Sequence, residues 1–324
     1  MFAACGIITL LLFVIDLGVG SVSILPREII GILTGMDSDP VHRSIIIDIR
    51  LMKAVVALLV GAALSVSGLQ MQTLFRNPLA GPYVLGISSG ASLGVALFIL
   101  AGPMLALPAE ISSLGIAGAA WIGAAAILAL IAAVGHRIKD IMVILILGMM
   151  FSSGVAAIVQ ILQYLSHEEA LKSFVIWTMG SLGDVTRQQL WIMLPAVAAG
   201  LILAVLTIKP LNLLLFGEEY ALTMGLDIRR SRSLLFISTT LLAGSATAFC
   251  GPIGFIGLAM PHVTRMLFDN SDHRVLIPAT MLTGGAVLLI CDIISKSLTL
   301  PINSITALLG IPVVVYVVVK NSMK

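Results

Sequence analysis

Long apolar stretches separated by short polar segments recur along the whole chain. The pattern predicts helices near residues 2–20, 51–72, 83–101, 113–134, 141–164, 190–208, 233–250, 275–294 and 303–319, and a shorter helix at 259–267. Stretches of about 20 apolar residues are long enough to cross a bilayer as helices. The strict alternation of a membrane β-barrel is absent. We therefore expect residues 1–324 to form a single all-α membrane domain, a polytopic transmembrane helical bundle of about ten helices.

Composition supports a membrane protein. Of the 324 residues, 59% are hydrophobic and 10% are charged, whereas soluble domains carry about 25% charged residues. A net charge of +2 gives no case for nucleic-acid binding. Cys5, Cys250 and Cys291 are too scattered to indicate a disulfide framework or a zinc site, so we predict no metal and no cofactor. The first residues lack a basic segment, so residues 1–17 are expected to be a retained helix.

The segment 68–94 interrupts this pattern. Pro78 and Pro82 prevent one continuous helix from running through it, and four further glycines punctuate it. A broken, polar segment between membrane helices is tolerated where protein or a water-filled cavity covers it. We expect it to line a translocation path, the alternative being an ordinary cytoplasmic loop. The polar residues predicted to line the path are Gln70, Gln72, Asn77, Ser88 and Ser89.

A second interrupted segment, 251–265, carries Pro261 and His262. We expect Pro261 in the first turn of a short helix. His262 is a capping or packing residue, or alternatively a ligand or proton carrier. Four small residues or prolines near 61–78 recur 183 positions later. Inverted repeats with broken helices are typical of transporters, so we predict repeat halves at 51–164 and 233–319.

The loop 210–232 is compact and charged. Glu218 and Glu219 precede Gly225 and a basic cluster, which predicts two short helices joined by a tight glycine turn. Such a loop is suited to docking into a groove on another protein. The alternative is a solvated loop whose arginines only follow the positive-inside rule.

Basic residues also indicate orientation. With a cytoplasmic N-terminus and ten crossings, eleven of the 18 lysines and arginines lie inside and seven outside, and the inside group includes Arg137, Lys139 and Lys324. Cytoplasmic segments carry the excess of lysine and arginine, so we predict that both termini are cytoplasmic.

Enzymatic motifs are weak. Residues 86–90 read G-x-S-x-G, but a nucleophile elbow needs a strand before Ser88 and a positioned base. Close packing of helices on small residues explains the pattern better. The chain has no G-x-x-x-x-G-K-[ST] phosphate loop, so it does not hydrolyse ATP by that route. We predict a transport subunit and no enzyme.

Acidic residues inside the membrane are typical of ion-coupled transporters. Asp16 and Asp292 are the two acids that fall within apolar stretches. Asp292 lies four residues before Lys296, which predicts a local pair near a helix end. An ion-coupled secondary transporter of a small solute therefore stays as an alternative, and it would need buried coupling acids.

Taken together, these segments resemble the FecCD family, whose members are permease subunits of type II ABC importers for iron-siderophores, haem and cobalamin. The similarity extends from about residue 50 to the C-terminus. It is carried by SGLQMQTLFRNPLAGPYVLGISSGASLG at 67–94, WTMGSL at 177–182, GEEYALTMGLDIRR at 217–230, GPIGFIGLAMPHVTRML at 251–267 and LPINSITALLGIP at 300–312.

The resemblance implies ten helices per subunit in a multi-pass protein of the bacterial inner membrane. It implies a homodimer around a central path, two cytoplasmic ATPase subunits and a periplasmic or lipoprotein substrate-binding protein. ATP hydrolysis by those partners would alternate the gates. The NPLAGP segment would form the inner gate, with Asn77 and Leu79 at the matching positions. Among the family's cargoes we favour a ferric siderophore or haem over cobalamin.

The resemblance also assigns roles at both ends of the subunit. The 210–232 loop would be the ATPase-coupling element, with Glu218, Glu219, Ala221 and Gly225 at the matching positions. In the family, basic side chains contact acidic residues of the binding protein. The positions that match them here are Arg50, Lys53 and Lys296. This chain departs from the family where lysine replaces the second arginine, because lysine offers a point charge in place of a bidentate fork.

Overall fold

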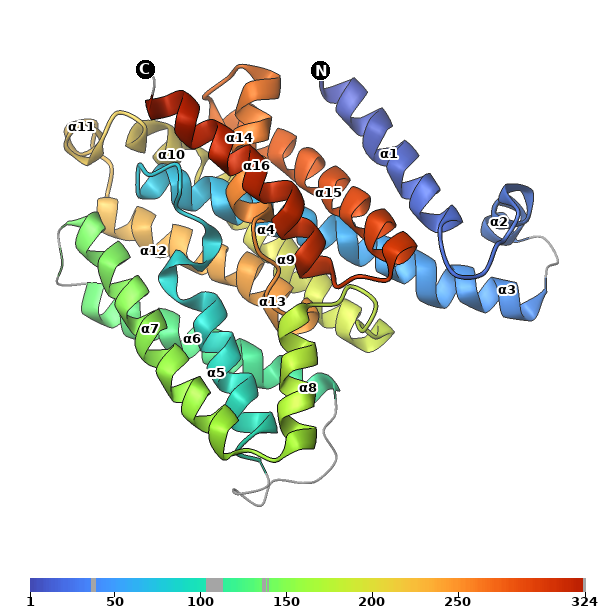
Figure 1. Ribbon diagram of the computed structural model, residues 1–324. Helices are drawn as coiled ribbons and strands as arrows, with labels where there is room; N and C mark the ends of the chain where they lie inside the picture. The colour runs from blue at the N-terminus through green and yellow to red at the C-terminus, as the bar shows by residue number, and fades with distance from the viewer. Residues whose placement is uncertain (36–38, 103–112, 136–137, 139, 323–324) are drawn as a thin grey trace.

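The computed structural model describes residues 1–35, 39–102, 113–135, 138 and 140–322, and over these ranges it contains helices and no strands (Figure 1). Three cations used above for orientation, Arg137, Lys139 and Lys324, lie outside the described residues. The all-helical fold class is therefore confirmed for the described part of the chain.

The α-helices follow the predicted apolar stretches, with several short helices between them. Their bounds are α1 (Phe2–Gly18), α2 (Pro26–Leu33), α3 (Pro40–Ser44), α4 (Met52–Leu74), α5 (Ile87–Ile99), α6 (Ser113–Gly135), α7 (Ile141–Leu165), α8 (Glu168–Met179), α9 (Arg187–Leu206), α10 (Ile208–Leu214), α11 (Glu218–Thr223), α12 (Ile228–Thr239), α13 (Ser245–Cys250), α14 (Ile256–Phe268), α15 (His273–Leu298) and α16 (Ile302–Ser322). A π-helical turn (Ile45–Leu51) leads into α4, another (Thr240–Gly244) joins α12 to α13, and a 3-10 turn (Pro82–Leu85) precedes α5.

Six helical segments of the described residues are long and apolar enough to cross a membrane: α6, α7, α9, the joined α12 and α13, α15 and α16. The helices α1 and α5 are shorter apolar helices. Large apolar side chains face outward from several of them, for example Ile122 on α6 and Leu308 on α16. An outward apolar face on a spanning helix is what a lipid environment requires. The structure thus describes a multi-pass membrane protein.

Helix α4 lies at the centre of the bundle, with α14 and α15 packed along it (Figure 1). Its residues from Val60 to Leu74 are buried, so α4 has no continuous lipid-facing side. The packing depends on glycine pairs. A Cβ at Gly61 would overlap the backbone carbonyl of Gly284, and a Cβ at Gly68 would overlap that of Gly257. Small residues let membrane helices approach to backbone contact, and these two pairs set the spacing at the core.

Helix α14 begins earlier than expected, which corrects the prediction for Pro261. The helix starts at Ile256, after Phe255 adopts a left-handed φ of 64°, so Pro261 lies inside it and not in its first turn. Proline cannot donate to the carbonyl four residues before it, which here belongs to Gly257. That is the carbonyl packed against Gly68. The expected break between α13 and α14 at 251–255 is confirmed.

Two further features distinguish the fold from the expectation. Helix α8 has 12 residues and was missed because it is too short to span and begins with Glu168 and Glu169. The glycine turn predicted within 210–232 joins the short helix α11 to α12, which continues beyond residue 232, and α10 precedes α11. In Figure 1, α10, α11 and both chain ends lie toward the top of the view, and α8 lies toward the bottom.

The close contact of α4 with α14 predicts that Gly68→Ala destabilises the subunit by about 1–3 kcal/mol or prevents its folding, because the added methyl group overlaps a backbone carbonyl. The midpoint of thermal unfolding in detergent measures the effect. Gly118→Ala on α6 is the matched control, since no heavy atom lies within 4 Å of a Cβ there. Equal melting temperatures for the two variants would contradict the packing argument.

Candidate functional site

The NPLAG turn, residues 77–81, follows α4 directly. Asn77 Oδ1 accepts a hydrogen bond from the backbone N–H of Leu79 at 2.9 Å, and the Asn77 carbonyl accepts one from Ala80 at 3.1 Å. Asparagine stabilises such turns through its own side chain. The turn leaves the Leu79 side chain 46% exposed. Asn77 thus shapes the turn, and Leu79 projects from it.

His262 of α14 ties this turn to the bundle. Its Nε2 atom lies 2.7 Å from the carbonyl oxygen of Pro78, and the histidine itself is buried. The two residues are 184 positions apart, so the bond joins segments that sequence alone does not bring together. Of the two interpretations of His262, the packing role fits this geometry.

The two glutamines predicted to line a path are buried within the subunit. The Gln70 amide exchanges hydrogen bonds with the Ser238 hydroxyl of α12, and its Oε1 also accepts one from Thr239. Gln72 donates to the Leu258 carbonyl at 3.0 Å and accepts from Arg265 at 2.7 Å. Both side chains therefore join helices in this conformation, and the predicted lining role finds no support in it.

Ser88 and Ser89 lie half-buried in the first turn of α5. The segment before them is the 3-10 turn Pro82–Leu85 and not a strand, so the nucleophile-elbow geometry is absent from this part of the chain. A Cβ at Gly90 would lie 2.5 Å from the Gly123 carbonyl of α6. The small residues of this motif thus serve close helix packing.

The 210–232 loop folds as the glycine turn predicts. Leu226 donates its backbone N–H to the Ala221 carbonyl and Gly225 donates to Leu222, which together form a Schellman motif at the end of α11. Gly225 has a φ of 80°, a conformation that glycine adopts without strain. Glu218 receives two bonds of 2.6 Å from Arg232 Nη2 on α12, and Ala221 is buried.

The outer surface of this loop is apolar. Phe216, Tyr220, Leu222 and Met224 have exposed fractions of 69%, 48%, 58% and 59%. The rings of Phe216 and Tyr220 lie 5.3 Å apart. The exposed Glu219 belongs to the same helix. A compact loop bracketed by charges therefore presents an apolar surface with one free acid.

Two sets of contacts connect this loop to the end of α4. Asn212 Oδ1 of α10 lies 2.7 Å from His273 Nδ1, and His273 Nε2 lies 2.9 Å from Thr73 Oγ1. Independently, the Arg76 guanidinium lies beside Gly217, with Nη1 3.2 Å from where a Cβ would be. Arg76 directly precedes the NPLAG turn and has a left-handed φ of 47°. The loop thus contacts the end of α4 and the residue that precedes the NPLAG turn.

Asp272 begins α15 beside this contact. Its carboxylate accepts the backbone N–H of Arg274 at 2.8 Å and the Asn212 amide at 2.6 Å. These two hydrogen bonds hold the pKa of Asp272 below its ordinary value. The residue therefore stays ionised near neutral pH and caps the helix.

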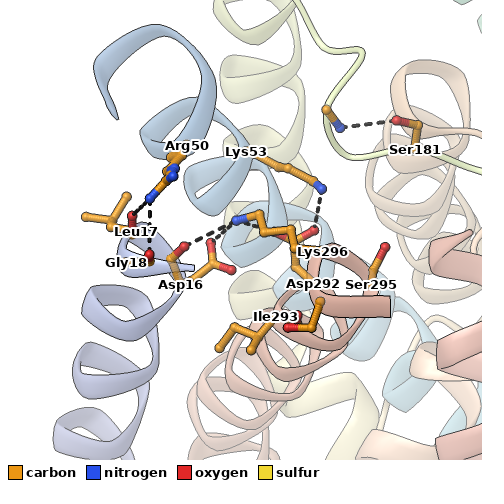
Figure 2. A network of polar contacts seen from close by, with 12 residues as sticks. Asp16, Leu17, Gly18, Arg50, Lys53, Ser181, Asp292, Ile293, Ser295 and Lys296 are labelled. Carbon is orange, nitrogen blue, oxygen red and sulfur yellow. Dashed lines mark hydrogen bonds and ion pairs between the residues drawn. The ribbon is translucent and has the colours of Figure 1, made fainter. Parts of the chain in front are cut away.

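At the opposite end of α4, four charged side chains form an ion cluster of Asp16, Lys53, Asp292 and Lys296 (Figure 2). Lys53 Nζ lies 2.9 Å from Asp292 Oδ1. Lys296 Nζ lies 2.8 Å from Asp292 Oδ2 and 2.8 Å from Asp16 Oδ2. The predicted local pair of Asp292 and Lys296 is confirmed, but it is one part of a cluster that joins α1, α4 and α15.

Arg50 lies next to the ion cluster and is 4% exposed. Its Nη1 donates to the carbonyl oxygens of Leu17 and Gly18 at 2.9 and 3.1 Å, and its Nη2 donates to that of Val22 (Figure 2). A cation suits the carbonyl end of a helix, so Arg50 caps α1. The predicted docking role needs an accessible guanidinium, and this arginine is occupied inside the subunit.

Comparison with known proteins identifies the architecture. Residues 8–320 match the model of the FecCD transport family. The chain belongs to that family. The vitamin B12 import system permease protein BtuC of Klebsiella pneumoniae is 39% identical over 84% of this chain and 82% of its own length. The hemin transport system permease protein HmuU of Yersinia pestis is 37% identical over 85% of this chain and 83% of its own.

A solved structure agrees over almost the whole chain. A metal-chelate type ABC transporter in an inward-facing conformation superimposes with a TM-score of 0.84 at 31% identity, covering 97% of both chains. This FecCD protein is therefore a membrane permease of an ABC importer, a transport subunit that works with ATPase and substrate-binding partners. The family and the permease function expected from the resemblance are confirmed.

Family membership and geometry both weigh against ion coupling. A coupling acid must be free to take up a proton or sodium ion. In this FecCD chain the carboxylates of Asp16 and Asp292 each face a lysine ammonium at 2.8 to 2.9 Å. Both acids are thus occupied by cations of the subunit itself.

The tether of the NPLAG turn predicts that His262→Ala loosens Leu79. A buried hydrogen bond contributes about 0.5–1.5 kcal/mol, so open forms of the turn should become roughly two- to tenfold more populated. The labelling rate of Leu79→Cys by a thiol reagent, in a Cys5→Ser background, measures this change. His42→Ala removes a histidine contact to Glu28 elsewhere and should leave the rate unchanged. Equal rates in all three proteins would refute the tether.

Proposed function

We propose that this permease imports a metal-containing chelate, with a ferric siderophore or haem favoured over cobalamin, as one of two identical subunits around a central path. Each subunit would cross the membrane ten times, with both termini in the cytoplasm. Support comes from relatives named for hemin and vitamin B12 and from a structural match of metal-chelate type.

The exposed apolar surface of the 210–232 loop carries the proposal for energy coupling. Phe216, Tyr220, Leu222 and Met224 are each about half exposed or more on a loop bracketed by charges. Exposed apolar patches rimmed by polar residues mark protein interfaces. We infer that an ATPase subunit receives this loop in a groove, with Glu219 at the rim. Glu218 instead fixes the loop to α12 through Arg232.

From the loop, motion would reach the inner gate by the two sets of contacts described above. A displacement of α10 moves Asn212 against His273, which bonds Thr73 at the end of α4. A displacement at Gly217 moves Arg76, which precedes the NPLAG turn. In this proposal Leu79 closes the path and Asn77 keeps its turn in shape.

On the other side of the membrane, Lys53 and Lys296 would meet acidic groups of the substrate-binding protein. Their side chains are 20% and 10% exposed, so both are partly open to solvent. Arg50 is occupied by the carbonyl end of α1, and in this proposal it holds that helix in place. The docking charge thus belongs to the two lysines.

The coupling role predicts that Glu219→Lys and Gly225→Trp each lower ATP-driven uptake at least about tenfold, a change equivalent to 1.4 kcal/mol of lost interaction. The first reverses a free charge at the docking surface, and the second adds bulk at a position where a Cβ has no neighbour within 4 Å. Uptake of cargo by proteoliposomes that contain the assembled importer measures the loss.

Two variants separate docking from folding. Glu168→Lys reverses an exposed acid at the start of α8 and should leave uptake normal. Glu218→Gln weakens the contact with Arg232 and should lower the thermal stability of the loop region as well as uptake. Normal uptake by both Glu219→Lys and Gly225→Trp would show that the loop is not the coupling element.

A further inference from the structure

The ion cluster has an arrangement that a simple helix-to-helix tie does not require. Asp292 bridges two lysines, one on each carboxylate oxygen, at 2.9 and 2.8 Å (Figure 2). Both contacts are ion pairs, and neither oxygen has a hydrogen-bond partner among the described residues. The charge of Asp292 is thus compensated by Lys53 and Lys296, and both lysines are held in place by the same acid.

Exposure within the cluster is asymmetric. The side chains of Asp16 and Asp292 are 0% and 1% exposed, whereas those of Lys53 and Lys296 are 20% and 10% exposed. The two lysine side chains are therefore partly open to solvent, whereas the two acids are enclosed. A carboxylate that approaches from outside can reach the lysines but not the acids.

The cluster is also electrically neutral, with two acids and two lysines. The nearby charge of Arg50 is directed to the carbonyl end of α1. An intact cluster thus offers little net positive charge to an acidic surface. The lysines that would attract a binding protein are masked from within by Asp16 and Asp292.

We propose that Asp292 and Asp16 are internal substitutes for the carboxylates of the docked binding protein. They hold Lys53 and Lys296 while the outer face is free, and acidic groups of the binding protein compete for the same ammonium groups when it docks. The Lys53 ammonium is ion-paired with Asp292 and has three N–H donors, so a second carboxylate can bind before the first is released. The proposal rests on the docking role proposed above.

Competition at Lys296 has a structural consequence. Lys296 is the residue of α15 that pairs with Asp16 of α1, through the Asp16 carboxylate and, at 3.4 Å, its backbone carbonyl. An external acid that draws Lys296 outward weakens the tie between α1 and α15. Docking is thereby coupled to the position of α1, and the two internal acids set how tightly the binding protein is held.

The test measures the affinity of the importer's own cargo-free binding protein for the permease–ATPase complex in nanodiscs. Asp292→Asn unmasks both lysines, and we expect a several-fold lower Kd that arises mainly from faster association and disappears at high salt. Asp16→Asn unmasks Lys296 only and should give a smaller gain. Asp292→Glu keeps the charge and should restore the original affinity.

Asp48→Asn is the matched control, because it removes one exposed negative charge two residues before Arg50 without touching the cluster. It should leave the Kd unchanged. If Asp48→Asn lowers the Kd as much as Asp292→Asn does, the effect depends on net charge alone and the proposal is overturned. Thermal unfolding of each variant confirms that it is folded, and Asp16→Asn carries the test if Asp292→Asn does not fold.

Lysine variants distinguish a failure of the docking role from a failure of the proposed competition. Lys53→Gln and Lys296→Gln should raise the Kd. If they leave it unchanged, the docking role itself fails. If they raise the Kd while neither Asp292→Asn nor Asp16→Asn lowers it, the acids are structural partners only, and the proposed competition is overturned.

Discussion

The contact of one backbone with another along α4 is the constraint on which the remaining structure depends. At Gly61 and Gly68 there is no room for a Cβ, because the carbonyls of Gly284 and Gly257 occupy that space. Lipid supplies no hydrophobic driving force between helices, so close packing and hydrogen bonds must hold the bundle. Pro261 contributes by leaving the Gly257 carbonyl without a helical donor at the point of contact. The polar bonds of Gln70 and Gln72 become possible because α12 and α14 approach α4 this closely.

Helix α4 connects the ion cluster to the segment that carries the NPLAG turn. The 23 residues of α4 span about 35 Å at the rise of an α-helix. Lys53 of the ion cluster lies at its start, and Thr73 and the NPLAG turn lie at its end. A binding protein that contacts Lys53 and an ATPase that acts on the NPLAG end through α10 and α11 would therefore act on the same helix. In the proposed mechanism, α4 would link docking at one of its ends to the gate at the other.

The sequence predicted those features that depend on local signals. The glycine turn at Gly225, the break around Pro78 and the pair of Asp292 with Lys296 are set by residues within a few positions of one another, and each is present. Features that depend on distant residues were not predicted. Asp16 and Lys296 are 280 positions apart, and no periodicity in the sequence indicates that their side chains are in contact. Gln70 was expected to line a path, because a neutral polar side chain in a membrane helix serves equally for lining and for bonding a neighbouring helix. The start of α14 was misplaced because the residue before it, Phe255, adopts a backbone conformation that is unusual for a bulky side chain.

The distribution of buried polar groups indicates where the energy for transport must enter. Along the middle of α4 and its neighbours the buried polar side chains are neutral, including Ser65, Ser67, Gln70 and Thr247. Charged groups with internal partners lie toward the ends of helices, in the ion cluster and at Glu218 and Arg232. Sliding neutral groups past one another costs a few hydrogen bonds, whereas moving a paired charge through the middle of the bundle would leave a buried ion without its partner. The described middle of this subunit therefore lacks a charge on which an ion gradient could act, and force has to be applied at the two ends. The apolar surface of the 210–232 loop and the reachable lysines of the ion cluster lie at those ends, which is the arrangement that a subunit worked by partner proteins requires.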